Sequence, residues 1–168
     1  MLKEVYEKPN DNFSCTPISC DFESEIIPEY DSSEFVLKDF HNKTEIVYSD
    51  LLTVYGLSWR LKVYPLGNDV ARDSFISVFI EMTEGFQESL KFDVRVELVN
   101  HISEGIVVSR EFSSNFEPGE SWGYNRFFKI DLLDTEGYLD PDTDSLKFRF
   151  HIRPPTYYQK SRIQSKFI

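Results

Sequence analysis

The chain has 168 residues, a net charge of −11 and an aromatic content of 15%. This length suits one domain with a core of normal size, and the supply of large apolar rings argues against a disordered chain. The acidic balance argues against nucleic acid as a partner, because phosphate binding depends on clustered basic side chains. No apolar stretch is long enough to span a membrane, and no secretory signal is visible at the N-terminus. We therefore expect a cytoplasmic protein, with the nucleus as the alternative compartment.

Most of the excess acid lies in residues 1–34, which hold nine Asp or Glu and two Lys. This region has no apolar periodicity and contains three prolines, so we expect an acidic, flexible N-terminal arm or linker whose charge serves solvation. Its two cysteines, Cys15 and Cys20, have no further Cys or His at a spacing suited to zinc. We predict free thiols and no metal site.

From residue 35 onward, apolar and polar residues alternate with the period of two that is typical of half-buried strands. Within residues 59–64, for example, Trp59, Leu61 and Val63 share one face of the predicted strand. Seven or eight short strands predict an all-β fold, an antiparallel β-sandwich over residues 35–155, followed by a C-terminal extension at 156–168. The predicted strands cover 35–37, 46–54, 59–64, 75–82, 92–98, 106–112, 126–130 and 146–152.

Two segments late in the chain have a different pattern. Residues 131–139 predict one or two helical turns that end near Gly137. Residues 140–144 (Asp-Pro-Asp-Thr-Asp) are similar to the start of a calcium loop. The glycine and glutamate that such a loop needs are replaced by Ser145 and His151, so we expect an Asp-rich turn instead.

Catalytic machinery is not evident in the sequence. The three histidines, His41, His101 and His151, are dispersed, and none has an activated nucleophile near it in sequence. The seven glycines form no phosphate-binding loop. We expect no catalytic residues in this domain, no cofactor and no metal.

The segment 75–82 contains the most informative anomaly. Its more continuous apolar face, which includes Ile76 and Val78, should point into the core, and parity then sends Phe75 and Phe79 outward. Tyr64 also falls on the outward face of its strand. Exposed aromatic rings among polar residues suggest a shallow site for an extended peptide. The alternative is that a loop or the N-terminal arm covers these rings.

Three segments in this order resemble the MATH (meprin and TRAF homology) domain, most closely that of ubiquitin ligases of the tripartite-motif class. The resemblance covers about residues 35–155 and implies an eight-stranded antiparallel sandwich that binds short linear peptides in a groove on one sheet. The segments are 56–67 (Gly-Leu-Ser-Trp-Arg-Leu-Lys-Val-Tyr-Pro-Leu-Gly), 75–80 (Phe-Ile-Ser-Val-Phe-Ile) and 122–128 (Trp-Gly-Tyr-Asn-Arg-Phe-Phe).

The resemblance also implies five groove positions in this chain: Phe79, Phe92, Ser114, Trp122 and Tyr124. Alternation places Phe92 on the core face, so it would reach a groove only through a bulge in its strand. Ser114 stands where the family pattern has an aromatic ring, which implies a shallower groove at that end. Trp122 has core packing as its alternative role.

These observations favour a protein–protein interaction module that recognises a short linear motif, with Tyr64 flanking the groove. The resemblance implies substrate recognition for a ubiquitin ligase whose RING-type domain and coiled coil would precede this segment. We expect the domain alone to be monomeric, because residues 1–34 contain no heptads, while the parent protein could be oligomeric. The alternative is a structural or oligomerisation module that packs its aromatic face on another subunit or domain.

Overall fold

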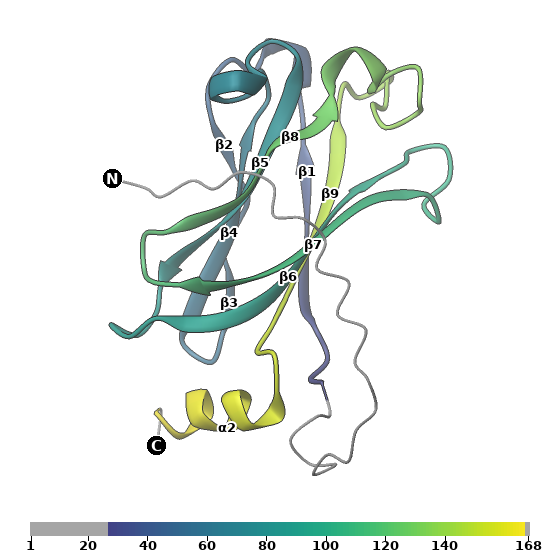
Figure 1. The fold of residues 1–168 in the computed structure, drawn as a ribbon. Coiled ribbons are helices and arrows are strands. Elements are labelled where there is room, and N and C mark those ends of the chain that lie inside the picture. The colour runs from purple at the N-terminus through teal and green to yellow at the C-terminus, as the bar shows by residue number, and fades with distance from the viewer. Residues whose placement is uncertain (1–26, 167–168) are drawn as a thin grey trace.

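The structure is a computed structural model and describes residues 27–166, in which two antiparallel sheets pack face to face (Figure 1). Residues 1–26, which include Cys15, Cys20 and most of the expected arm, lie outside the described residues. Sheet A contains β1 (Asp31–Leu37), β9 (Leu146–Arg153), β6 (Leu90–Val99) and β7 (Val107–Phe116), in that order. Sheet B contains β2 (Val47–Tyr48), β4 (Leu57–Tyr64), β5 (Phe75–Glu84) and β8 (Ser121–Lys129), and β3 (Leu52–Val54) also pairs with β4.

The predicted all-β sandwich is confirmed, with nine strands in the described part of the chain. The ninth arises because the expected strand at 46–54 is divided near Ser49. The Ser49 side chain accepts a hydrogen bond from the Leu61 amide at 2.9 Å, so a side chain replaces a backbone group in the ladder there. Tyr55 and Gly56, both at positive φ, then form the tight turn that pairs β3 with β4.

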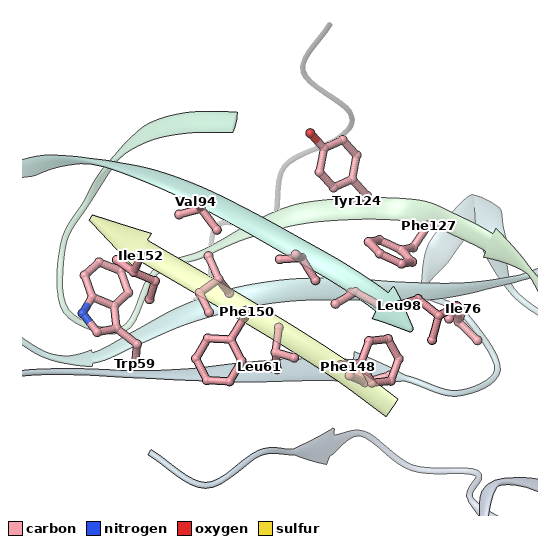
Figure 2. Close-up of a cluster of buried hydrophobic side chains, with 14 of the residues drawn as sticks. Trp59, Leu61, Ile76, Val94, Leu98, Tyr124, Phe127, Phe148, Phe150 and Ile152 are labelled. Atoms are coloured by element: carbon pink, nitrogen blue, oxygen red, sulfur yellow. The ribbon is translucent and has the colours of Figure 1, made fainter. Parts of the chain in front are cut away.

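For the main strands, the structure confirms which side chains the alternation predicted to point into the core. Trp59, Leu61 and Val63 of β4 are at most 1% exposed. Figure 2 shows Trp59 and Leu61 among the inward side chains of sheet A. The Trp59 ring lies 4.8 Å from that of Phe92 and 4.9 Å from that of Phe116, both edge-on. Each such side chain stabilises the fold by about 1.5–3 kcal/mol when it leaves water.

The first strand begins at Asp31, four residues before the expected boundary. β1 is an edge strand of sheet A, and its outward positions Ser32, Glu34 and Val36 are exposed. Its first half therefore carries little of the apolar alternation by which strands are recognised. The pairing with β9 nevertheless starts at Asp31, which lies opposite Ile152.

The C-terminal extension contains a helix, α2 (Tyr157–Ser165), which lies below the sheets in the view of Figure 1. Thr156 caps its N-terminus by accepting a hydrogen bond from the Gln159 amide at 3.2 Å. Ile163 is fully buried and, with Tyr55 and Trp59, lines a small cavity at this end of the sandwich. A single buried residue thus fastens this helix to the core.

The predicted turns are also present. Residues Ile130–Leu132 form a 3-10 turn, and the segment ends at Gly137, whose φ is 84°. Asp140 and Ser145 bridge a turn over the Asp-rich stretch, as expected. Two further 3-10 turns span Phe40–Asn42 and Asp69–Ala71. Within residues 27–166, no helix is both long and apolar enough to cross a bilayer.

Candidate functional site

The outward direction predicted for Phe79 is correct, but its predicted exposure is wrong. Phe79 lies opposite Lys62 of β4 and Gly123 of β8, on the face of sheet B that points away from the core. Its side chain is nevertheless 0% exposed. Alternation fixes the direction in which a side chain points, whereas its exposure depends on what lies over it. The burial of Phe79 therefore favours the alternative in which this ring is covered.

Gly123 is what allows Phe79 to fit closely on this sheet. A Cβ atom at Gly123 would lie 2.2 Å from the carbonyl oxygen of Val78 and 2.6 Å from the Cα of Phe79, so only glycine permits this approach. The Tyr64 ring packs edge-on against Phe79 with a centroid distance of 5.8 Å. Tyr64 itself is half-buried and forms one flank of the Phe79 ring.

Charged side chains share this surface with the aromatic rings. Arg60 donates a hydrogen bond to the Glu81 carboxylate at 3.2 Å, and its guanidinium lies 3.8 Å from the centroid of the Tyr48 ring. Lys62 is only 2% exposed, and its ammonium lies 5.3 Å from the Tyr64 ring. We call this surface the outer face of sheet B. It comprises Arg60, Lys62, Tyr64, Ser77, Phe79, Glu81, Ser121, Gly123 and Asn125.

Three buried polar atoms on the outer face of sheet B have no hydrogen-bond partner in the described part of the protein: Arg60 Nε, Glu81 Oε2 and Ser121 Oγ. Leaving such an atom unsatisfied costs about 1–3 kcal/mol. Ser77, at the other end of the face, is fully satisfied. Its hydroxyl donates to the Asn125 carbonyl at 2.6 Å and accepts from the Asn68 amide at 2.9 Å.

Trp122 and Tyr124 point to the opposite side of sheet B. Their register partners are Ile80 and Val78, which are core residues, so both rings face inward. Tyr124 is 4% exposed, whereas Trp122 is half-buried at the margin of the core. The Trp122 indole N–H donates to the Glu120 carboxylate at 3.1 Å. These two rings therefore do not share a surface with Phe79.

Both rings lie at the side of the sandwich where β7 and β8 are the edge strands of the two sheets. The Tyr124 hydroxyl donates to the Glu111 carbonyl at 3.2 Å, and the Phe112 ring lies edge-on at 5.7 Å. Arg110 donates to the Phe127 carbonyl at 3.2 Å. We call this contact between the two edge strands the β7–β8 seam, with Arg110, Glu111, Phe112, Ser114, Trp122, Tyr124 and Phe127 as its members.

Phe92 lies in the core rather than in a surface groove. It is 2% exposed, packs on Trp59, and pairs with Ser114 in a ladder that continues without interruption from Leu90 to Val99. No bulge therefore turns its ring outward, and the placement by alternation holds. Ser114 is 5% exposed and belongs to the seam. The groove positions implied by the resemblance are thus divided among three places: the outer face of sheet B, the seam and the core.

Arg110 and Lys62 were not singled out in the sequence. Arg110 stands at an inward position of β7, between Val108 and Phe112, and a charged residue at such a position is a signal that alternation could have supplied. Lys62 gave no such signal, because a lysine at an outward position is what a solvated face would also carry.

The outer face of sheet A has a different character, since cations and carboxylates alternate across it. Glu34 pairs with both Lys147 and Arg149, and Arg153 donates to Asp93 at 3.2 Å. Burial raises the pKa of the Tyr30 hydroxyl, and this is opposed by the Arg153 guanidinium, which lies 4.0 Å from the Tyr30 ring. The remaining members are Arg95 with Glu111, and His151 between Ser32 and Glu97.

Among residues 27–166, no three His, Cys, Asp or Glu side chains converge in a way that could hold a metal ion. The ionisable side chains described above instead form pairs with one another or contact aromatic rings. The outer face of sheet B and the β7–β8 seam present aromatic rings, edge-strand backbone groups and a few buried charges.

Comparisons with known proteins agree with this architecture. The human E3 ubiquitin-protein ligase TRIM37 is 49% identical over 175 residues, which cover all of this chain and 18% of that protein. BTB/POZ and MATH domain-containing protein 5 of Arabidopsis thaliana is 32% identical over 57% of the chain and 26% of its own length. The solved structure of Notothenia coriiceps TRAF5 superimposes with a TM-score of 0.63 at 15% identity, over 73% of this chain and 72% of that one.

The chain spans less than a fifth of the length of TRIM37, so the likeness concerns one domain of that protein. The family model of the MATH domain matches residues 32–152, from the second residue of β1 to the last but one of β9. With its sandwich, its two edge strands at the seam and this match over most of its length, the chain belongs to the MATH domain family.

Proposed function

We propose that this domain binds a short, extended segment of a protein partner at the β7–β8 seam, next to the outer face of sheet B. The MATH domain is a protein-interaction fold, which supports a binding role. The observation that carries the proposal is the seam itself. Two edge strands from different sheets lie next to each other there, bridged by side-chain hydrogen bonds, and they carry Phe112, Ser114 and the half-buried Trp122.

Edge strands recognise peptides by adding them as a further strand. Their outer backbone amides and carbonyls are available for a new ladder, and the side-chain pockets along the edge then select the sequence. At the seam, the Trp122 ring would contact an apolar side chain of the partner. Ser114 is a small side chain among the seam members, on the β7 strand.

Phe79 and Tyr64 have a supporting role in this proposal. Phe79 is fully buried, so it forms the floor of the outer face of sheet B, and Tyr64 forms its flank. Phe92 acts further away, by packing on Trp59 beneath the strands that carry the site. We therefore rank Trp122 first among the residues that contact the partner.

We further propose that the partner is a substrate of a ubiquitin ligase of the tripartite-motif class. The support is the likeness to TRIM37, which is named as an E3 ubiquitin-protein ligase. In this proposal the ligase activity resides in a RING-type domain outside this segment, and the MATH domain selects the protein to be modified. A single short peptide should bind with a Kd of about 1 μM or weaker, and oligomerisation of the parent would add avidity.

The test is a peptide array probed with the full 168-residue chain and repeated with Trp122→Ala. We expect a short consensus motif whose binding falls at least tenfold in the variant, after circular dichroism shows that the variant remains folded. Tyr158→Ala is the matched control, because Tyr158 is a 67%-exposed ring on α2, away from the seam. A motif that binds both variants equally, or no motif at all, would remove the seam from consideration.

Light scattering of the same samples tests the structural alternative. A stable oligomer that persists on dilution and is lost in Trp122→Ala, without peptide binding, would favour an assembly role for this surface. A concentration-independent monomer that binds peptide supports recognition.

A further inference from the structure

The end of the sandwich near α2 is covered by a helix that is weakly attached to the two sheets. α2 has nine residues, and helices shorter than about 12 residues are marginal in water on their own. Ile163 is its one buried side chain, whereas Tyr157 and Tyr158 are 38% and 67% exposed. In the described part of the chain, the backbone hydrogen bonds of α2 stay within the helix and its cap. Side chains alone therefore hold this helix to the sandwich.

Three side chains of α2 make these contacts. The Lys160 side chain is hydrogen-bonded to the Tyr55 hydroxyl, which raises the pKa of the lysine, and its ammonium lies 5.6 Å from the centre of the Tyr55 ring. Lys166 forms an ion pair with Glu88 of the β5–β6 loop. Surface contacts of this kind contribute little to stability, so the burial of Ile163 supplies most of the attachment.

Tyr55, the partner of α2 in the turn between β3 and β4, has an unusual backbone conformation. Its φ of 53° lies in the left-handed region, which a bulky residue rarely adopts and which costs free energy. Glycine or asparagine would form this turn more easily. The Tyr55 side chain lines the small cavity that also receives Ile163. The side chain at this strained position is thus used to dock α2.

The same cavity connects α2 with the β7–β8 seam. Trp59 and Phe92 line it together with Ile163. The Phe116 ring lies 4.9 Å from the Trp59 ring and 6.3 Å from the Phe92 ring, so these three rings form one cluster. Phe92 is the register partner of Ser114, and Phe116 is the last residue of β7. The end of β7 therefore packs on the rings that α2 covers.

We propose that α2 is a latch that opens while the sandwich stays folded, and that its docked state stabilises the Ser114 end of the seam. Release of Ile163 removes the cover from the Trp59 ring and loosens the ring cluster beneath β7. This inference rests on the proposed function for its regulatory meaning, because a looser β7 edge binds an added strand less well. The opening of α2 itself is independent of any partner.

Native-state hydrogen exchange of the full 168-residue chain tests whether the latch opens on its own. After correction for intrinsic rates, we expect the amides of residues 161–165 to exchange about 100-fold faster than the protected amides of β6. Such a difference means that the helix opens without unfolding the sheets. Exchange of α2 at the rate of β6 would overturn the proposal, since the helix would then open only when the whole domain unfolds.

Ile163→Ala tests the link between α2 and the seam. We expect α2 to lose its remaining protection and the protected amides of residues 112–116 to exchange about tenfold faster. The protected amides of residues 146–149 in β9 should keep their rates, which separates a local effect from a general loss of stability. Tyr158→Ala, on the exposed side of the same helix, should leave residues 112–116 unchanged. Release of α2 without faster exchange in residues 112–116 would overturn the proposal.

Tyr55→Asn removes the docking contact from the opposite side. Asparagine tolerates the left-handed conformation, and the buried rings of Trp59 and Phe92 remain in place, so this variant decides the outcome if Ile163→Ala does not fold. We expect exchange to become about tenfold faster both in α2 and in residues 112–116. Slower exchange of α2, as relief of backbone strain alone would give, contradicts the latch.

The inference and the proposed function can fail separately. A motif found on the peptide array should, when added, slow the exchange of α2 as the bound fraction grows, because coupling between two sites is reciprocal. An array without a motif, together with coupled exchange of α2 and residues 112–116, would remove the proposed function alone. A motif that binds and leaves the exchange of α2 unchanged would remove the inference alone.

Discussion

The two outer faces of this sandwich come from strands with similar alternation and yet have opposite characters. On sheet A, the outward carboxylates of Glu34 and Glu111 are 46% and 53% exposed and pair with neighbouring cations. On sheet B, Lys62 and Phe79 are at most 2% exposed. The difference shows that period two specifies a direction for each side chain, whereas the layer above it specifies whether that side chain meets water.

This contrast depends first on the close approach of β5 and β8. We expect Gly123→Ala to lower the free energy of unfolding by about 3 kcal/mol, because the new Cβ would overlap the backbone of Val78 and Phe79. Equilibrium denaturation in urea measures the loss. Gly105→Ala is the matched control, since a Cβ at Gly105 meets nothing within 4 Å, and its effect should stay within about 0.5 kcal/mol. Equal losses in both variants would contradict the close fit at Gly123.

A second, smaller difference between the two outer faces is expected in the coupling energies of their ion pairs. A double-mutant cycle on Arg60 and Glu81, whose side chains are 31% and 9% exposed, should give a coupling of about 1.5 kcal/mol. The same cycle on Arg95 and Glu111, at 39% and 53%, should give about 0.5 kcal/mol or less, because water screens that pair. Urea denaturation of the single and double alanine variants supplies both values. A larger coupling on sheet A would reverse the comparison.

The smallest expected effect is on the pKa of Glu104, a carboxyl that pairs with Lys147 on the exposed outer face of sheet A. The Lys147 ammonium, which donates to Glu104 at 2.9 Å, and the nearby Arg149 hold the pKa of the Glu104 carboxyl below its ordinary value. A depressed carboxyl pKa stabilises the fold at neutral pH, and this contribution is lost as the pH falls through the pKa of the folded state. An NMR titration of Glu104 should show its pKa rise towards the ordinary value in Lys147→Met. Lys91→Met, on another strand position of sheet A, should leave the Glu104 titration unchanged.

Much of this fold could be predicted from the sequence, because strand geometry fixes the direction of successive side chains. The inward sets of β4, β6 and β9 and the outward direction of Phe79 all followed from alternation. The helix α2 did not, since Ile163 is its one buried residue and no apolar stripe marks it. A capping signal was nevertheless present, with Thr156 followed three residues later by Gln159.

The site was predicted less completely, for a physical reason. The seam depends on contacts between strands of different sheets, such as those from Tyr124 to Glu111 and from Arg110 to Phe127. Nothing local in the sequence specifies which edge strands meet. The resemblance supplied Trp122 and Tyr124 as candidates, and the structure shows that they face inward at the seam, on the other side of the sheet from Phe79.

Under the proposed function, the two hydrogen bonds that cross the seam also limit how long a recognised motif would be. The Glu111 and Phe127 carbonyls are occupied by Tyr124 and Arg110, so neither is available to a new strand. On β7, the edge that remains runs from Phe112 to Phe116, about 17 Å at the rise of an antiparallel strand. Under the proposed function, a partner would therefore present about five residues to this edge. Sequences that short recur by chance in many proteins, so discrimination among substrates would have to come from the local concentration of each, set by the assembly that carries the domain.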